Sequence, residues 1–188
     1  MNIYIICIVI CAGIFIINGI MIFRAAKERI TSEIYIHTGF IIFFSLFALE
    51  LTLGNIEVWN RFDIPWIRTV GYVLYIPSAF FVVSSLISLK HKGKPKTHDF
   101  TASTIFIDTG IYAITRQPMT LGMGIWSIAF VFVFQSILSI ILGVLSLFCF
   151  WISARKEAEY NIRKFGEVYK EYMKKVPMWN IFKGLKKK

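Results

Sequence analysis

The stretch PMTLGMGIWSIAFVFVFQSILSIILGVLSLFCFWIS, residues 118–153, contains no Asp, Glu, Lys or Arg. It consists of two apolar runs, 118–134 and 136–153, which only the short interruption FQS separates. Each run approaches the length of about 20 residues with which a helix crosses the hydrocarbon core of a bilayer. The stretch therefore predicts a tight helical hairpin whose two ends return to the same face of a membrane.

Three further apolar runs precede the hairpin, at residues 2–23, 34–53 and 65–89. A chain of 188 residues of which 56% are hydrophobic is too apolar for an ordinary soluble domain. Runs slightly shorter than the bilayer core can still cross it where the bilayer thins locally. We therefore predict an all-α, polytopic integral membrane protein with about five transmembrane helices.

Charged residues outside these runs predict the orientation of the chain. Basic residues outnumber acidic ones by three to two in residues 24–33, by five to two in 90–119 and by eleven to four in 155–188. Residues 54–64 instead carry one basic and two acidic residues. Because cytoplasmic segments are enriched in Lys and Arg, we expect the N-terminus outside, the C-terminus in the cytoplasm and an odd number of spans.

The first apolar run is expected to be retained as a helix. No small-residue cleavage site follows it, and the basic flank RAAKER begins directly after Phe23, which is the wrong side for a signal peptide. The compact size favours the plasma membrane of a prokaryote, and a eukaryotic endoplasmic reticulum fits the charge pattern equally well. The formal net charge of +10 needs no nucleic-acid partner, because the basic excess lies outside the apolar runs.

The whole chain, residues 1–188, is expected to form one membrane domain. Residues 1–89 would hold three transmembrane helices, residues 90–177 a motif-bearing loop, the hairpin and a tail helix, and residues 178–188 a basic C-terminal tail. The hairpin contains Gly122-Met123-Gly124. We interpret these glycines as small residues that allow close helix packing, because a dinucleotide-binding glycine motif would follow a strand.

Apolar residues recur in the tail at steps of three and four, at Ala158, Ile162, Phe165, Tyr169, Tyr172 and Val176. This spacing predicts an amphipathic cytosolic helix that is interrupted at Gly166 and ended by Pro177. Its apolar stripe would pack on the inner ends of the transmembrane helices, and its basic face would meet anionic lipid head groups. Taken alone, the tail predicts a membrane anchor.

The hairpin brings two polar segments to the same membrane face. Arg116 and Gln117 precede its first helix, and Glu157 and Glu159 follow its second. Donors and carboxylates that gather beneath an amphipathic helix predict a polar site that opens toward lipid. Each residue also has a structural interpretation, with Arg116 as a snorkelling flank, Pro118 as the first residue of a helix, and the glutamates as members of surface ion pairs.

Three parts of the sequence occur in a distinctive order. GIY at residues 110–112 is followed by RQPM at 116–119 and by Gly122, then by the hairpin, and then by RKEAEYNIRKFGEVYKEYMKKVP at 155–177. The order resembles the superfamily of isoprenylcysteine carboxyl methyltransferases and phospholipid methyltransferases. There, an Arg-His-Pro motif precedes a transmembrane hairpin, and a Glu-Glu pair follows it, ahead of a Phe/Tyr-Gly-x-x-Tyr-x-x-Tyr run. The resemblance covers residues 97–177.

The resemblance implies methyl transfer from S-adenosylmethionine at the cytosolic membrane face, with the cofactor entering from water and a lipophilic acceptor from lipid. The expected acceptor is a small lipid-like molecule or a prenylcysteine-type carboxylate. Arg116 and Glu157 would be the catalytic residues. The residues implied in cofactor binding are Tyr112, Arg116, Gln117, Pro118, Gly122, Glu157 and Glu159.

The sequence departs from the superfamily pattern at three positions. Gln117 stands in place of the histidine, Thr120 in place of a common tyrosine, and Ala158 in place of the second glutamate. Glu159 lies one residue further along, about 100° around a helix. Glutamine forms hydrogen bonds but cannot carry a proton as imidazole does, so activity depends chiefly on Gln117.

Three alternatives to a prenylcysteine-type methyltransferase follow from these departures and from the tail. The first is a noncatalytic lipid- or partner-binding protein of the same fold. The second is a phospholipid amine N-methyltransferase. The third is a sterol-type reductase, which would need nicotinamide-binding residues. The sequence leaves the acceptor and the oligomeric state open.

Two further observations concern ionisable residues away from the motif. Glu50 lies near the outer end of the second apolar run, where an acid is either functional or snorkels to the interface. The three histidines, His37, His91 and His98, show no ligand spacing with cysteine or carboxylate, so no metal site is predicted.

Overall fold

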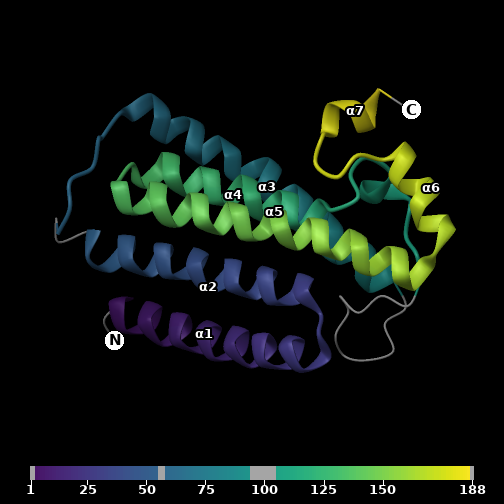
Figure 1. Ribbon diagram of the computed structural model, residues 1–188. Helices are drawn as coiled ribbons and strands as arrows, with labels where there is room; N and C mark the ends of the chain where they lie inside the picture. The colour runs from purple at the N-terminus through teal and green to yellow at the C-terminus, as the bar shows by residue number, and fades with distance from the viewer. Residues whose placement is uncertain (1–2, 55–57, 94–104, 187–188) are drawn as a thin grey trace.

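The computed structural model describes residues 3–54, 58–93 and 105–186, which are mostly helical (Figure 1). The described residues contain no β-strand beyond one isolated bridge between Arg61 and Ser136. The helices in chain order are α1 (Ile3–Glu28), α2 (Thr31–Thr52), α3 (Pro65–Lys92), the 3-10 helix η2 (Gly110–Ala113), α4 (Pro118–Phe134), α5 (Ile137–Phe165), α6 (Glu167–Lys175) and α7 (Ile181–Leu185). Residues 94–104 of the predicted inner loop, with His98, lie outside the described residues.

The long helices pack side by side in an order that differs from their order in the chain. Helix α1 packs on α2, α2 packs on α5, α5 on α4, and α4 on α3, as Figure 1 shows. The hairpin of α4 and α5 therefore lies between α2 and α3. Large apolar side chains such as Ile16, Phe23 and Ile76 are exposed on the outer helices, as expected where lipid is the surrounding solvent.

Four helices are long and apolar enough to cross a membrane: α2, α3, α5, and residues Ile8–Glu28 of α1. Helix α4 is also apolar but has only 17 residues. The predicted all-α, polytopic membrane fold is confirmed. The number of crossings stays a prediction, because α4 is the short member on which a count of five depends.

The predicted hairpin is confirmed, with only Gln135 and Ser136 between α4 and α5. Gln135 adopts a left-handed conformation with φ of 53°, which turns the chain sharply. Ser136 then caps α5 by accepting a hydrogen bond of 2.9 Å from the backbone N–H of Ser139. Along the hairpin, the Ser146 hydroxyl donates to the Ser127 hydroxyl at 2.9 Å. Antiparallel packing thus brings α5 back to the level where α4 begins, and α5, with 29 residues against 17 in α4, continues past it toward α6 (Figure 1).

Glu50 does not snorkel, contrary to one of the two sequence interpretations. Its side chain is fully buried, and its carboxylate accepts a hydrogen bond of 2.9 Å from Arg61 Nη2 and one of 3.3 Å from Trp59 Nε1. It also accepts a hydrogen bond from the Ser136 hydroxyl at the hairpin tip. Residues of two distant segments thus donate hydrogen bonds to the Glu50 carboxylate inside the protein, so the side chain does not need to extend to the membrane interface.

The tail helix is interrupted at Gly166, as predicted. Gly166 has φ of 64°, in the region that favours glycine, and it separates α5 from α6. The helix that contains Ala158 and Phe165 is a direct continuation of the second hairpin helix, so α5 runs unbroken from the membrane into the polar region. Beyond the break, Tyr169 and Tyr172 of α6 pack on Ala158 and on Phe106. The apolar stripe therefore folds back on itself.

Candidate functional site

The motif around Arg116 lies directly beneath the C-terminal tail. The backbone N–H of Arg116 donates to the Pro177 carbonyl at 3.0 Å, and the Thr115 hydroxyl donates to the Met178 carbonyl. Gly184 of α7 packs so closely on the motif that a Cβ atom there would lie 2.0 Å from the Ile114 carbonyl oxygen. Residues beyond 177, which the sequence predicts to be a basic tail, thus pack directly on the motif segment.

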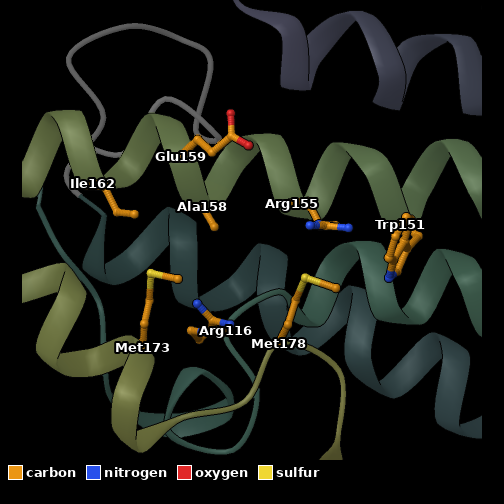
Figure 2. A pocket seen from close by; sticks show the side chains of 8 residues that line it. All are labelled: Arg116, Trp151, Arg155, Ala158, Glu159, Ile162, Met173 and Met178. Atoms are coloured by element: carbon orange, nitrogen blue, oxygen red, sulfur yellow. The ribbon is translucent and has the colours of Figure 1, made fainter.

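A pocket of about 340 Å³ opens between α5, α6 and this tail, and Figure 2 shows its lining. The volume lies in the range of about 300–1,000 Å³ that is usual for small-molecule sites. The lining residues are Arg116, Trp151, Arg155, Ala158, Glu159, Ile162, Met173 and Met178. Two of them, Arg116 and Glu159, are among the residues that the sequence predicts for the site.

Arg116 projects toward this pocket from the segment before α4, and the sulfur atoms of Met173 and Met178 lie on either side of it (Figure 2). Its Nε and Nη1 atoms are buried and make no hydrogen bond to any described residue. A buried donor without an acceptor costs about 1–3 kcal/mol, and more when it is charged. The guanidinium is thus suited to bind an anionic or acceptor-rich group of a ligand.

Gln117 and Glu157 meet behind Arg116, as the hairpin geometry predicts. Gln117 is 4% exposed, its Nε2 atom has no hydrogen-bond partner among the described residues, and its side chain lies beside the Glu157 carboxyl. Asn161, one helical turn beyond Glu157, lies beside the same carboxyl. Arg116, Gln117 and Glu157 are therefore close neighbours.

Glu159 is on the same helix and is among the pocket-lining residues, but its side chain leaves the helix in a different direction from that of Ala158, which occupies the position of the superfamily's second glutamate. Its side chain is 54% exposed and pairs with Lys156 at 3.0 Å. In Figure 2 its carboxylate points away from Arg116, whereas Ala158 points toward the pocket. The turn of about 100° between successive helical residues accounts for this difference.

Five of the seven predicted cofactor residues lie outside the pocket lining: Gln117 and Glu157, described above, and Tyr112, Pro118 and Gly122. The Tyr112 hydroxyl shares a hydrogen bond of 2.9 Å with Ser85, and the Tyr112 carbonyl accepts one of 2.6 Å from the Tyr172 hydroxyl. Burial raises the pKa of Tyr112, so its hydroxyl stays protonated. Pro118 is fully buried as the first residue of α4. Gly122 faces α3.

Gly122 and Gly124 allow close packing, as the sequence predicts. A Cβ atom on Gly122 would lie 2.7 Å from Val82 Cγ2, and the Ser78 hydroxyl donates to the Gly122 carbonyl at 2.9 Å. A Cβ atom on Gly124 would lie 3.0 Å from Leu147 and 3.2 Å from Trp179. Small residues at these positions let α4 approach both α3 and the tail.

Thr120 also has a structural role in holding the tail. The side chain is 1% exposed, and its hydroxyl accepts a hydrogen bond of 3.3 Å from the indole of Trp179. The same hydroxyl donates to the Gln117 carbonyl at 3.2 Å. The threonine that replaces the superfamily tyrosine thus links the start of α4 to the residues that cover it.

Two polar residues of this region, Tyr169 and Asn161, were not predicted from the sequence. Tyr169 is 3% exposed, and its hydroxyl is buried without a hydrogen-bond partner among the described residues. It lies near Asn161, Glu157, Arg116 and Gln117. Tyr169 falls on the apolar stripe of the tail. The periodic pattern therefore accounts for its buried ring and gives no indication that its hydroxyl has a role. The feature that could have identified Tyr169 is the Phe/Tyr-Gly-x-x-Tyr-x-x-Tyr run of the superfamily, in which it occupies a tyrosine position.

Comparison with known proteins agrees with the motif order. The family model described as phospholipid methyltransferase matches residues 66–168, which is more than half of the chain. Curated relatives include the protein-S-isoprenylcysteine O-methyltransferases of Xenopus laevis, 27% identical over 156 residues, and of Homo sapiens, 29% identical over 147 residues. The enzyme of the same name from Dictyostelium discoideum is 26% identical over 147 residues. No solved structure matches.

The relatives are longer than this chain. The matches cover 73–74% of this chain but only 53%, 50% and 61% of the Xenopus, human and Dictyostelium proteins, respectively. The family match begins at the start of α3 and extends through the hairpin into α6, so it includes Arg116, Gln117 and Glu157. With this match, and with the hairpin and motif in the predicted arrangement, the chain belongs to the phospholipid methyltransferase family of integral membrane proteins.

Proposed function

We propose that this protein transfers a methyl group from S-adenosylmethionine to the carboxylate of a membrane-embedded, prenylcysteine-type acceptor. The observation that carries the proposal is the Arg116 guanidinium, in which two buried nitrogen atoms find no partner among the described residues, beside a pocket of about 340 Å³. The names of the curated relatives support the acceptor class.

The residues present fit the cofactor. S-adenosylmethionine carries a carboxylate and ribose hydroxyls, which accept hydrogen bonds from the unpartnered donors of Arg116 and Gln117. Its ammonium group suits the Glu157 carboxyl. Apolar and aromatic side chains of Trp151, Ile162 and Met173 line the rest of the pocket and suit an adenosine moiety.

When bound, the cofactor supplies an electrophilic methyl group on a positively charged sulfonium. Arg116 would hold a carboxylate in place, because its planar donors match the geometry of a carboxylate. Trp151, Ile162 and Met173 would exclude water from the pocket. Exclusion of water favours a reaction in which opposite charges neutralise each other, so an anionic acceptor suits this site.

A carboxylate acceptor also needs no general base, whereas a protonated phospholipid amine would have to lose a proton. Glu157 is the carboxyl placed beside Gln117 and would have to accept that proton. The carboxylate acceptor therefore asks less of this site. It leaves Glu157 free to orient the cofactor rather than to transfer protons.

The proposal is tested in two stages on detergent-purified protein. Calorimetric titration first measures binding of S-adenosylmethionine and of S-adenosylhomocysteine, and we expect dissociation constants well below millimolar. Transfer of a labelled methyl group is then measured to N-acetyl-S-farnesylcysteine and, in parallel, to phosphatidylethanolamine in mixed micelles. We expect labelling of the first acceptor.

Each other result has a definite meaning. Labelling of phosphatidylethanolamine alone would replace the carboxylate acceptor with an amine. If neither S-adenosylmethionine nor S-adenosylhomocysteine binds at millimolar concentration, the enzymatic proposal is overturned. That failure would favour a noncatalytic lipid-binding role, for which Gln117 and Ala158, in place of a histidine and a glutamate of the superfamily pattern, are the motivating residues.

A further inference from the structure

The Tyr169 hydroxyl is a buried polar group that meets the geometric criteria for a hydrogen bond with none of the described residues. Its ring is packed between Phe106 and Tyr172, with centroid separations of 5.8 and 5.6 Å, and this packing accounts for the ring alone. The hydroxyl lies beside Asn161 and Gln117 but makes no well-aligned hydrogen bond to any described residue. Buried hydroxyls are normally paired, so an unpaired one calls for a specific explanation.

Other atoms in the same place share this property. Arg116 Nε and Nη1 and Gln117 Nε2 are also buried and without partners among the described residues, and both side chains interact with Tyr169. All three groups are hydrogen-bond donors, and burial raises the pKa of Tyr169, so its hydroxyl keeps its proton. Hydrogen-bond donors that the described residues leave unpaired suit a carboxylate, which has about four lone-pair sites for them.

An acidic group is also present. The Glu157 carboxyl lies near Tyr169 and Gln117, with Asn161 beside it. The cluster therefore combines two kinds of group. Arg116 is a cation, with further hydrogen-bond donors from Gln117 and Tyr169, and Glu157 is an acid, with the amide of Asn161 beside it. A zwitterionic ligand could place its carboxylate against Arg116 and its ammonium group against Glu157. Such pairing is most important in a buried site, because an unpaired charge is costly where water is excluded.

We propose that the Tyr169 hydroxyl touches the amino-acid end of the cofactor and donates to its carboxylate, together with Arg116 and Gln117, while Glu157 faces its ammonium group. This inference rests on the proposed function and assigns a residue and a subsite to it. A peptide-linked or N-acetylated acceptor has a carboxylate but no ammonium, so it would satisfy only half of the cluster.

Tyr172 provides a matched control three residues away. Its hydroxyl is engaged in a hydrogen bond of 2.6 Å to the Tyr112 carbonyl, whereas the Tyr169 hydroxyl has no such bond. Tyr172→Phe should therefore lower the melting temperature. Tyr169→Phe should leave the melting temperature unchanged or raise it, because it removes a buried polar group that lacks a partner.

Binding of three probes tests the proposal by calorimetry. S-adenosylhomocysteine carries both the carboxylate and the ammonium group, its decarboxylated analogue keeps only the ammonium group, and methylthioadenosine lacks both. In Tyr169→Phe we expect affinity for S-adenosylhomocysteine to fall by about tenfold or more, as for loss of a hydrogen bond to a charged group. The affinity of Tyr169→Phe for the other two probes should stay within about twofold of that of the unaltered protein, which corresponds to a change of only a few tenths of a kcal/mol.

Two results would overturn the proposal while the proposed function stands: equal affinity of Tyr169→Phe and the unaltered protein for S-adenosylhomocysteine, or an equal loss for all three probes. A further measurement uses the unaltered protein alone and does not depend on the variant's folding. It should bind S-adenosylhomocysteine at least about tenfold more tightly than the decarboxylated analogue, and equal affinities would also refute the subsite. Failure to bind any probe would overturn the proposed function together with this inference.

Discussion

The backbone N–H of Arg116 donates to the carbonyl of Pro177 at 3.0 Å, across 61 positions of the sequence. The bond joins the segment before the hairpin to the segment after the tail helix. It is reinforced by the hydroxyl of Thr115, which donates to the Met178 carbonyl, and by Trp179, which donates to Thr120 at 3.3 Å. The position of Arg116 therefore depends on the last part of the chain.

Gly184→Ala tests this dependence. A Cβ atom at Gly184 would lie 2.0 Å from the Ile114 carbonyl oxygen, so the tail would have to move away from the motif. We expect a loss of about 1–3 kcal/mol in the free energy of unfolding, as for other overpacked sites, and weaker binding of S-adenosylhomocysteine. Thermal unfolding in detergent and calorimetry measure the two effects.

Gly13→Ala is the matched control for this substitution. Apart from the adjoining backbone of α1 itself, no atom of the described residues lies within 4 Å of a Cβ built on Gly13, so the variant should be as stable as the unaltered protein or slightly more stable. If Gly184→Ala behaves like Gly13→Ala in both assays, the tail does not hold the motif in place.

Arg116→Ala should weaken binding of S-adenosylhomocysteine by about 1.5–3 kcal/mol, which is roughly 10- to 100-fold. The reason is the loss of a charged donor whose Nε and Nη1 atoms have no hydrogen-bond partner among the described residues. Arg116→Lys should recover little of this loss, because an ammonium group lacks the planar, forked donors of guanidinium. Calorimetry on both variants provides the measurement.

The exposed Arg163 on α5 serves as a control for net charge. Arg163→Ala removes the same charge away from the pocket and should leave the affinity within about twofold, a change of a few tenths of a kcal/mol. Equal losses for Arg116→Ala and Arg163→Ala would mean that Arg116 acts through its charge at long range, without contact to the ligand.

The sequence predicted those features of the fold that depend on local patterns. The apolar runs predicted the hairpin at Gln135, and the glycine within the apolar stripe of the tail predicted the break at Gly166. The partners of Glu50 could not be predicted, because the Ser136 hydroxyl that binds it is 86 positions away. Side-chain pairs at such separations are fixed by packing, which no local pattern encodes.

The site followed the same division. Motif order and hairpin geometry predicted that Arg116, Gln117 and Glu157 would be neighbours, and the structure places them together. The role of Tyr169 was not visible, because a tyrosine at an apolar position of a helix satisfies the periodic pattern whatever its hydroxyl does. The contacts of Trp179 and Gly184 with the motif segment were not predicted, because the many lysines of that part of the chain resemble a solvated tail.

Gln117→His restores the residue of the superfamily pattern. Gln117 is 4% exposed and lies beside Glu157, so an imidazole there would be next to a carboxyl that can stabilise its charged form. We expect higher affinity for S-adenosylmethionine and faster methyl transfer than in the unaltered protein, measured by calorimetry and by labelled methyl incorporation. Gln117→Leu is the control of similar size without hydrogen-bonding groups, and it should lose affinity.

A loss of affinity in Gln117→His would carry the opposite meaning. It would indicate that the buried space around Gln117 is adapted to an amide, so that the glutamine is a working member of this site. Unchanged affinity in both variants would place Gln117 outside the cofactor site altogether.

The ion pair between Glu50 and Arg61 makes a prediction about stability that is independent of catalysis. Glu50 is fully buried and Arg61 Nη2 lies 2.9 Å from its carboxylate, at the opposite end of the hairpin from Arg116. Arg61→Leu would leave a buried carboxylate without its cation, a change that typically costs 3–5 kcal/mol, about ten times the effect of a surface pair. Thermal unfolding in detergent provides the measurement.

The pair of Arg68 and Asp63 is the matched control, since both side chains are considerably exposed, at 34% and 69%. Arg68→Leu should cost less than about 1 kcal/mol. The double variant Glu50→Leu with Arg61→Leu should be more stable than Arg61→Leu alone, because it removes the uncompensated charge together with its partner. If the two losses were simply additive, the partners would contribute independently, and the role of Arg61 in neutralising Glu50 at the hairpin tip would have to be abandoned.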